Sequence, residues 1–556
     1  MRNRNPTATR RDRYRELDHP RPANVRTVRR PTEGASPAMP SRALVWFRRD
    51  LRTADHPALL AALAAADQVV PVFVVDRTLL EGRTTGPNRR AFLRAALQSL
   101  ARDLEALGGR LLLREGDPVT VIPALARQAA ADAVYCSREH TPYARRRDTA
   151  VEQALRTDGR TLHALPGVYL SAFDELSTNE GTPFRVFAPF ARAARAAAWD
   201  DPLPAPTQVP VPDQADAPGL WTTGPADPGD GLRSPTGGPG PGPGGSGAPR
   251  GGTSAKSDGF GVDGAVEITP PAPAAALERL RWFVARRVDG YARARNFMGT
   301  DGTSRLSPYL RFGLVSPRQV AAAVASVPGA RGGGRRTAEH PGRAGDRETF
   351  VNELLWRDFY GYVLYHRPES AWEHMRPELA RFRFEDDPEG LAAWQQGRTG
   401  YPLVDAGMRQ LTGQGWVHNR ARMVVASFLT KHLLVDWREG ARFFLQHLLD
   451  GDLPSNNGGW QWVAGTGADA APYYRVFNPV TQAEKFDPAG DYIRRWVPEL
   501  AKLQVPAIFA PWQTSRADLE AAGVRLGADY PRPIVDHATA RTRALARFEA
   551  ARSRVS

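Results

Sequence analysis

Apolar and polar positions alternate in blocks over residues 42–167. The short apolar runs, separated by polar turns, have the length of buried strands. Between them, apolar residues recur every three or four positions, which is typical of helices. Strands and helices that alternate across short links predict a parallel sheet covered on both faces. The predicted strands are 42–47, 68–75, 110–115, 133–136 and 161–167, and the predicted helices are 56–66, 89–107, 119–130 and 143–157.

The pattern changes in the C-terminal half, which carries almost no strand signal. From about 272 to 525 the apolar residues follow helical spacing. Ten of the 13 tryptophans of the chain lie here, so this region has either a very aromatic core or a planar ligand. The predicted helices are 274–289, 316–326, 347–366, 390–396, 403–413, 418–434 and 438–449.

These patterns predict a Rossmann-like α/β domain followed by an all-α domain. No GxGxxG motif opens the first helix, so the usual dinucleotide-binding fingerprint is absent. The Arg-rich N-terminus, the Gly/Pro-rich run 235–252 and a polar insert at 329–346 show no apolar periodicity and are expected to be disordered or flexible. The predicted parts are a basic tail (1–40), the α/β domain (41–170), a linker (171–271), the helical domain (272–525) and a C-terminal segment (526–556).

The charge and cysteine content narrow the class of protein. A formal net charge of +14 and a pI of about 10.2 favour a polyanionic partner such as nucleic acid. Only four of the 74 basic residues are lysine, so a codon bias towards arginine is an alternative explanation. The single cysteine, Cys136, excludes an internal disulfide and a cysteine-based zinc site. Without a long apolar stretch or a secretory signal, we expect a cytosolic protein with no membrane span.

One turn in the helical region is rich in hydroxyl groups. GTSRLSPYLRFG (302–313) places Thr303, Ser304, Arg305 and Ser307 just before a helix. Backbone N–H groups and hydroxyls at a helix start can bind an anion, although an ordinary helix cap explains the same residues.

Other motifs combine acids, guanidinium groups and flat rings. Glu353, Trp356 and Arg357 are spaced to share one helix face. They suit an aromatic ligand with hydrogen-bonding edges, or an Arg–Glu pair covering a core tryptophan.

A second set of polar residues follows nearer the C-terminus. Asn419 and Arg422 share a helix face, and Asp450 and Asp452 offer carboxylates to Arg422. The Asp-x-Asp pair could bind a metal, but the surrounding chemistry is aromatic and cationic, and we expect no metal.

Five motifs together resemble the photolyase/cryptochrome family. They are GYPLVDAGMRQL (400–411), GWVHNRARM (415–423), DWREG (436–440), DGDLPSNNGGWQW (450–462) and APYYRVFNPVTQAEKFDP (471–488). The resemblance extends from about 42 to 550, is closest to class I cyclobutane pyrimidine dimer (CPD) photolyases, and implies light-driven repair of UV-damaged DNA by a monomer with bound FAD.

The resemblance also implies residues for the flavin. The family holds FAD in its reduced, anionic form, and Asn419 matches the residue that faces flavin N5. The positions that match the family's FAD contacts are Tyr291, Thr303, Ser304, Arg305, Leu306, Ser307, Phe350, Arg422, Asp450, Asp452 and Asn456.

A pocket for the dimer follows from the same resemblance. Trp356 and Trp462 match the rings that flank the flipped dimer, and Glu353 matches the acid that hydrogen-bonds its carbonyl edge. Photolyases are among the enzymes known to take the target nucleotide out of the stack. We expect an extended segment at Trp460 and Trp462, with Trp460 facing the flavin and Trp462 the substrate. Arg295, Asn419 and Met423 complete the pocket wall, and Arg357 and Arg420 are further predicted DNA contacts.

The family reduces its flavin through three tryptophans, and this chain departs from that pattern. Trp460 and Trp437 match the first two, but the third position holds Phe384. Phenylalanine is much harder to oxidise than tryptophan. The hypothesis is that flavin photoreduction is weakened or uses another route, with Trp394 as the candidate.

The N-terminal domain resembles the family's antenna domain. WFRRDLR (46–52), with Arg49 and Arg52, and EHTPYARRRD (139–148), with Glu139 and Tyr143, match its pocket. Their form favours 8-hydroxy-5-deazaflavin over 5,10-methenyltetrahydrofolate as second chromophore.

Three alternatives within the family stay open at this point. A cryptochrome photoreceptor often carries a long C-terminal tail, which this chain lacks after 533–553. A (6-4) photoproduct enzyme would need a histidine pair, whereas the motif here reads His418-Asn419. A DASH-type, single-strand-specific enzyme usually lacks the second tryptophan of WQW.

Overall fold

The computed structural model describes residues 40–213, 215, 217, 220–221, 270–326, 342–376, 379, 382–469 and 474–553. The predicted basic tail and the Gly/Pro-rich run lie outside them. Of the polar insert predicted at 329–346, residues 342–346 are described, and they form the start of helix α11 (Gly342–His366). That part of the prediction was wrong, because Asp346 anchors the helix by accepting hydrogen bonds from the backbone N–H groups of Gly290 and Ala292 at 2.8 and 2.9 Å.

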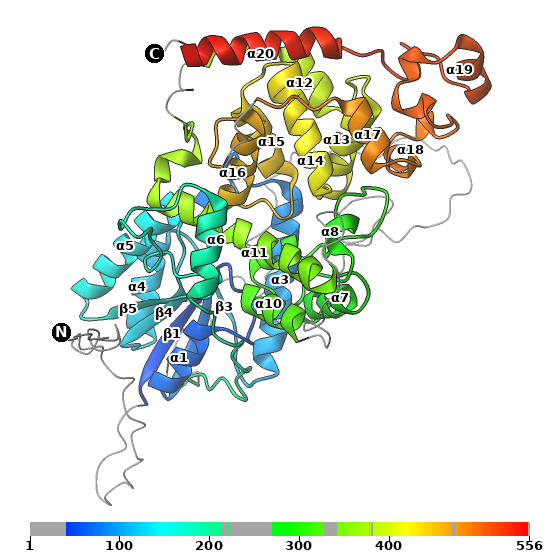
Figure 1. Cartoon of the computed structure of the whole chain (residues 1–556). Coiled ribbons are helices and arrows are strands. Elements are labelled where there is room, and N and C mark those ends of the chain that lie inside the picture. The colour runs from blue at the N-terminus through cyan, green and yellow to red at the C-terminus, as the bar shows by residue number, and fades with distance from the viewer. Residues whose placement is uncertain are drawn as a thin grey trace, which may run out of the picture. The chain divides into compact units, whose positions relative to one another are not determined.

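The described residues contain one five-stranded sheet with the order β3-β2-β1-β4-β5, and every pair in it is parallel (Figure 1). In the central strand β1, Trp46 lies opposite Val72 of β2 and Cys136 of β4. The predicted strands and fold class are confirmed. The strands are β1 (Arg42–Phe47), β2 (Gln68–Val75), β3 (Leu112–Glu115), β4 (Ala133–Ser137) and β5 (Thr161–Leu165).

Helices cover both faces of this sheet, as predicted. Alternate side chains of β1 enter two different cores: Val45 and Phe47 pack with α1 and α3, whereas Leu44 and Trp46 pack with α4 and α5. From β1 the chain first adds β2 and β3 on one side and then adds β4 and β5 on the other side of β1. This reversal opens a crevice at the carboxyl ends of β1 and β4. The helices of this half are α1 (Pro57–Ala65), α2 (Arg77–Leu80), α3 (Pro87–Glu105), α4 (Pro118–Gln128), α5 (Pro142–Thr157) and α6 (Phe187–Ala196).

The described residues from 270 onward contain helices and no named strand. Many of these helices have proline in their first turn, where its missing N–H is tolerated. The helices are α7 (Pro273–Arg286), α8 (Tyr291–Ala294), α9 (Ser307–Phe312), α10 (Pro317–Ala325), α11 (Gly342–His366), η1 (Pro368–Ala371), α12 (Pro388–Gln395), α13 (Pro402–Gln414), α14 (Asn419–Ser427), η3 (Phe428–His432), α15 (Trp437–His447), α16 (Leu453–Ala464), α17 (Pro479–Phe486), α18 (Asp491–Trp496), η4 (Pro498–Leu500), η5 (Ala507–Phe509), η6 (Pro511–Gln513), α19 (Arg516–Ala522) and α20 (His537–Ser553).

All seven helices predicted in this half are present, and others were missed. The predicted helix at 418–434 is α14 continued by the π-helical turn η3. Helix α20 carries buried residues at Ala540, Ala544, Phe548 and Ala551. This spacing is helical and could have been recognised within the segment assigned only as C-terminal. The predicted domain boundaries stay a prediction.

Arg52, predicted at the antenna pocket, holds the α/β and helical parts together instead. Arg52 is 2 % exposed, and its guanidinium donates to the carbonyl oxygens of Asp55, Gly313 and Gly167 at 2.7 to 3.3 Å. The backbone N–H of Leu51 also donates to the carbonyl of Phe312 at 3.1 Å. Gly313 is required here, because its φ is +66° and a Cβ would collide with the carbonyl of Arg49.

Candidate active site

A cavity of about 560 Å³, here called the helical cavity, opens among α8, α9, α11, α14 and α16. Its volume lies within the usual range for small-molecule sites. Most of the predicted site residues meet in its wall, although the outermost two, Tyr291 and Trp462, are 171 residues apart in the sequence. The predicted residues that line it are Tyr291, Arg295, Thr303, Ser304, Arg305, Leu306, Ser307, Phe350, Glu353, Trp356, Arg357, Asn419, Arg422, Met423, Asp450, Asp452, Asn456, Trp460 and Trp462.

The hydroxyl-rich turn before α9 is held in place by an arginine that the sequence did not single out. Arg279 donates to the carbonyl oxygens of Thr303 and Ser304, both at 2.9 Å, and pairs with Asp301 at 2.9 Å. Arg305 has a φ of +52°, a conformation that residues other than glycine rarely adopt. Its guanidinium lies 5.0 Å from the ring of Trp416. The turn is therefore fixed on both sides before any ligand binds.

Arg422 and Asp450 form an ion pair, as predicted. Arg422 Nη2 lies 2.8 Å from one carboxylate oxygen of Asp450, while its Nε donates to the carbonyl of Val417 at 2.8 Å. The other oxygen of Asp450 is buried and has no hydrogen-bond partner in the described part of the chain. Buried polar atoms are nearly always satisfied. An acceptor left free at a cavity wall therefore fits a ligand N–H group, such as that of a flavin ring.

Trp460 and Trp462 lie on helix α16, so the expectation of an extended segment was wrong. Residues two apart in a strand share a face, whereas in a helix they lie about 200° apart, so the helix is what separates the two rings. Trp460 is 3 % exposed and packs edge-on against Phe444 at 5.0 Å between ring centroids. Trp462 is half-buried and donates its Nε1–H to the carbonyl of Asp469 at 3.1 Å.

Two glycines explain why α16 was mistaken for an extended segment. Gly458 and Gly459 disfavour a helix by about 1 kcal/mol each relative to alanine. A Cβ at Gly458 would collide with the ring of Tyr360 on α11. A Cβ at Gly459 would meet nothing within 4 Å, and Gly459 lines the helical cavity. The free space thus reaches the helix backbone, as a tightly held planar ligand requires.

Glu353 is the acid of this cavity. It pairs with Arg295, and both side chains are about one-third exposed or less. Burial raises the pKa of the Glu353 carboxyl, and the nearby Arg295 only partly opposes that effect. The protonated form, which can donate a hydrogen bond, is therefore more accessible than in an ordinary glutamate.

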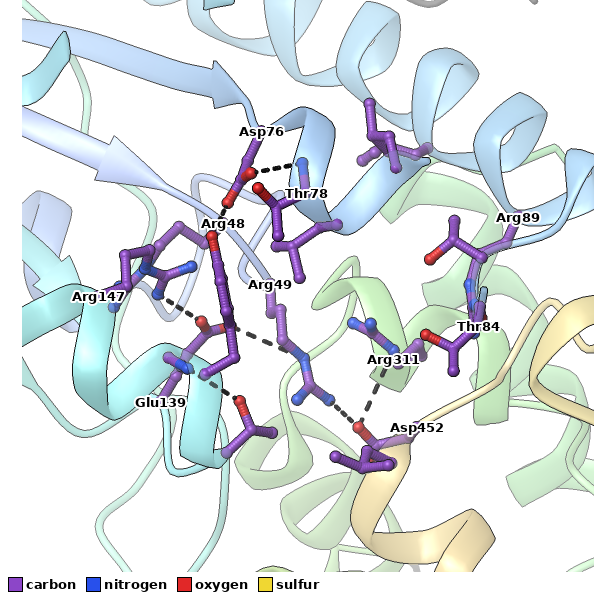
Figure 2. A pocket seen from close by; sticks show the side chains of 18 of the residues that line it. Arg48, Arg49, Asp76, Thr78, Thr84, Arg89, Glu139, Arg147, Arg311 and Asp452 are labelled. Atoms are coloured by element: carbon purple, nitrogen blue, oxygen red, sulfur yellow. Dashed lines mark hydrogen bonds and ion pairs between the residues drawn. The ribbon is translucent and has the colours of Figure 1, made fainter. Parts of the chain in front are cut away.

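A second cavity of about 410 Å³, here called the sheet-end cavity, lies at the carboxyl ends of β1, β2 and β4. Figure 2 shows Arg49, which follows β1, reaching towards Glu139 on one side and Asp452 on the other. Arg49 Nη2 lies 2.6 Å from Asp452, and Arg147 Nη2 lies 2.8 Å from Glu139. Burial alone would raise the pKa of Glu139, but Arg48, Arg147 and Arg49 lower it to about 2.

The sheet-end cavity carries an excess of positive charge. Five arginines line it against three carboxyl groups. Burial, together with the charge of Arg49, lowers the pKa of Arg311 to about 9. An anionic ligand would relieve this crowding of cations. The lining arginines are Arg48, Arg49, Arg89, Arg147 and Arg311, and the acids are Asp76, Glu139 and Asp452.

Of the predicted antenna residues, Arg49, Glu139 and Tyr143 line this cavity. Tyr143 donates its hydroxyl to Asp76, which was not predicted. Arg48 lies over the ring of Trp46 at 4.5 Å, and the WFRRDLR motif could have identified it. Arg89 and Arg311 carried no local signal, because they come from helices distant in sequence.

Asp452 and Arg311 line both cavities. Asp452 immediately precedes α16 and is buried between Arg49 and Arg311. Burial would raise the pKa of Asp452, but Arg49, Arg311 and Arg357 together hold it below its ordinary value. A shared, permanently charged wall thus separates the two sites.

Two family models match the chain: "DNA photolyase" over residues 43–209 and "FAD binding domain of DNA photolyase" over residues 350–550. A deoxyribodipyrimidine photo-lyase from Agrobacterium fabrum is 39% identical over 507 residues, which are 91% of this chain and 97% of that protein. The chain belongs to the DNA photolyase family. The resemblance seen in the sequence is thereby confirmed.

Solved structures of DNA photolyases and a cryptochrome share the fold. A class III photolyase from Agrobacterium tumefaciens matches with a TM-score of 0.77 and 36% identity, over 94% of this chain and all (100%) of that one. A cryptochrome from Synechocystis sp. PCC6803 matches with a TM-score of 0.75 and 30% identity, over 92% of this chain and 100% of that one. The finer assignment to class I stays a prediction.

The tryptophans predicted to carry electrons in this photolyase share one buried hydrophobic core, in which two separate sets of ring contacts occur. Trp460 contacts Trp394 edge-on at 6.0 Å between centroids, and both are almost fully buried. Trp437 is 0 % exposed and lies 6.4 Å from the ring of His374, which lies 6.0 Å from Phe384. None of Trp394, Trp437 and Phe384 lines the helical cavity.

Arg357, predicted to contact DNA, is engaged inside the photolyase fold. It donates to the carbonyl of Val168 at 2.7 Å and lies 4.6 Å from the ring of Tyr169. With a side chain 12 % exposed, it holds the segment after β5, and its predicted contact with DNA stays a prediction.

Arg420 contacts neighbouring side chains but stays near the surface. It donates to Asn296 at 2.5 Å and lies 4.2 Å from the ring of Phe486. It does not line the helical cavity.

No group of histidine, cysteine and acidic residues suited to a metal occurs among the residues whose positions are described. In the same residues, no helix is long and apolar enough to span a membrane.

Proposed function

We propose that this photolyase is a deoxyribodipyrimidine photo-lyase that uses light to split cyclobutane pyrimidine dimers in DNA. The observation that carries this proposal is the wall of the helical cavity. Two aromatic rings, Trp356 and Trp462, and one carboxyl group with a raised pKa, Glu353, face the same space. That combination suits two stacked bases with carbonyl edges.

FAD fits the remainder of the helical cavity. The free acceptor of Asp450 suits a flavin ring N–H, and Gly459 leaves room for a ring close to the helix backbone. Thr303, Ser304 and Ser307 offer hydroxyls for the phosphates and ribose. When bound and reduced, FAD supplies on illumination the electron that opens the cyclobutane ring and is then returned.

The protein's own side chains orient the dimer and the flavin. Aromatic stacking contributes about 1–3 kcal/mol per base, so Trp356 and Trp462 can offset the cost of removing the dimer from the duplex. Asn419 lies at the first position of α14, with Met423 one turn further along the same cavity wall. An asparagine amide does not readily donate a proton, which favours an anionic flavin beside it.

The entrance residues can bind the DNA backbone. Arg295 lines the helical cavity and Arg420 lies on α14 nearby. Contacts to phosphates release counterions, so the affinity for DNA should fall with rising salt concentration.

For the sheet-end cavity we propose a second, planar and anionic chromophore. The five lining arginines favour an anion, and Trp46 with Tyr143 offers aromatic surface. Of the two predicted chromophores, 8-hydroxy-5-deazaflavin meets these requirements through its acidic ring hydroxyl. Excitation at this chromophore's own absorption band should then drive repair in reconstituted protein.

Repair under blue light tests the proposal directly. Reduced protein would be mixed with oligonucleotides that carry one cyclobutane thymine dimer, as single strands and as duplexes, with dark controls. Light-dependent repair of both would support the photo-lyase. Repair of single strands alone would favour the DASH-type alternative, and no repair with FAD bound and reduced would favour a photoreceptor of the cryptochrome type.

A further inference from the structure

Phe187, the first residue of α6, lies flat against Trp356. The two ring centroids are 3.8 Å apart and the planes differ by 6°. Aromatic pairs in proteins prefer edge-to-face or offset geometries at 4.5–7 Å. So close and parallel an arrangement needs both rings to be held by their own surroundings.

The surroundings of both rings are indeed fixed. Trp356 meets Phe359 edge-on at 5.7 Å and Tyr360 at 5.5 Å. Helix α6 docks on α11 through Phe190, which is 0 % exposed and lies 5.4 Å from Phe359. A hydrogen bond from Arg195 to Asn352 joins the two helices further along. Phe187 is therefore presented from a rigid platform.

The stack leaves one face of Trp356 for a ligand. Trp356 lines the helical cavity, whereas Phe187 does not. Because one face of the indole is covered by Phe187, a flat ligand in the cavity can stack only on the other. Phe187 comes from the segment between the two folded halves, to which the sequence assigned only a linker.

We propose that Phe187 is a positioning residue for dimer recognition. It holds the indole of Trp356 in the orientation that a flipped pyrimidine dimer requires. The ring is therefore ordered before the dimer binds, and no binding free energy is lost in ordering it. Phe187, Trp356 and one base of the dimer would then form a continuous stack. The inference rests on the proposed function, since it takes Trp356 as the surface that receives the dimer.

The test is dark binding of a fluorescent oligonucleotide with one thymine dimer, compared with the undamaged oligonucleotide. Phe187→Ala should weaken binding of the damaged strand roughly two- to twelvefold. Binding of the undamaged strand, FAD content and the rate of light-driven flavin reduction should not change. Phe187→Tyr, which keeps the flat ring, should restore the affinity.

Two further variants separate positioning from general stability. Phe548→Leu changes a buried ring of α20 that packs on Tyr474 in a different hydrophobic cluster from Trp356, and should lower the melting temperature while leaving dimer affinity at the wild-type value. In a Trp356→Ala background, Phe187→Ala should cause no additional loss, because its effect passes through the indole. An equal loss in both backgrounds would overturn the inference.

The outcomes also separate this inference from the proposed function. If wild-type protein does not prefer the damaged strand, the proposed function fails. If wild type prefers it and Trp356→Ala loses that preference, but Phe187→Ala matches wild type, the function stands and Phe187 has no positioning role.

Discussion

Glu139 and Glu353 both line cavity walls, yet their pKa values move in opposite directions. Glu139 in the sheet-end cavity faces Arg48, Arg147 and Arg49, and its pKa falls to about 2. Glu353 in the helical cavity has Arg295 alone, and burial raises its pKa. Burial penalises the charged form in each case, so the number of cations decides the direction.

The same difference runs through the two cavities. In the sheet-end cavity Glu139 and Asp452 are paired with arginines and Asp76 accepts hydrogen bonds, and what remains is an excess of cations for an anionic ligand. In the helical cavity one oxygen of Asp450 has no partner among the described residues and Glu353 is only partly compensated. Polar groups without a hydrogen-bond or ion-pair partner mark the surface that a ligand would contact, whereas groups that already have partners stabilise the fold around it.

The largest expected effect concerns the ion-paired carboxylate Glu139 of the sheet-end cavity. Glu139→Gln removes the carboxylate that pairs with Arg147 and Arg49 and should lower the free energy of unfolding by roughly 3 kcal/mol, as measured by urea denaturation. Because the folded pKa of Glu139, about 2, lies below its unfolded value, this contribution is complete above the unfolded pKa. It is lost as the pH falls through the folded one.

The matched control is Glu152→Gln. Glu152 forms an exposed i,i+4 pair with Arg156, and such pairs contribute about 0.5 kcal/mol or less. A difference between wild type and Glu139→Gln that does not shrink at low pH would contradict the electrostatic explanation.

Asp450→Ala tests the role of the unpartnered carboxylate oxygen in the helical cavity. Removing the free acceptor should weaken retention of FAD roughly ten- to hundredfold, measured as the ratio of flavin to protein after dialysis. Retention of a chromophore in the sheet-end cavity should not change, because Asp450 does not line it. Asp452→Ala, which alters the shared wall, should weaken both. Equal effects of the two variants on both ligands would show that the cavities are not distinct.

The raised pKa of Glu353 predicts a pH dependence of dimer binding. Only the protonated carboxyl can donate to a base carbonyl, so dark affinity should fall roughly two- to tenfold as the pH rises through the pKa of Glu353. Glu353→Gln carries a permanent N–H donor and should bind with little dependence on pH. Fluorescence titrations at several pH values give the profile, and an unchanged profile in the variant would rule out this role.

The sequence predicted most strands and helices correctly, but not the tertiary packing that stabilises some of them. Apolar periodicity located the strands and the helices α7 and α10 to α15, because each buries a continuous face. It failed at α16, where Gly458 and Gly459 are kept for close packing and open space despite their helix propensity. Propensity is a weak prior that tertiary packing overrides.

The site was predicted in part for a similar reason. Motif residues such as Asp450 and Trp462 could be named, because the resemblance fixes them one by one. Phe187 on Trp356 and Arg279 on the turn at Thr303 belong to segments without a motif. Arg311 lies in GTSRLSPYLRFG (302–313), but nothing in that motif indicates a place between two cavities. Only the fold brings them to the site, so their roles required the structure.

The smallest expected effect concerns the tryptophans behind the helical cavity. Phe384 contacts His374, which contacts Trp437, whereas Trp394 contacts Trp460 directly. Phe384→Trp should speed light-driven flavin reduction several-fold, because tryptophan is oxidised far more easily than phenylalanine. If electrons reach the flavin through Trp394 in the wild-type protein, Trp394→Phe should slow light-driven flavin reduction.

Transient absorption in the presence of a reductant measures both rates. An unchanged rate in Phe384→Trp would sink the idea that position 384 limits flavin reduction, and an unchanged rate in Trp394→Phe would exclude Trp394 as the alternative route. Dark dimer affinity should be the same in both variants, since neither residue lines the helical cavity. A change in affinity would mean that the aromatic cluster behind Trp460 also shapes the binding surface, and the separation between electron supply and recognition would be lost.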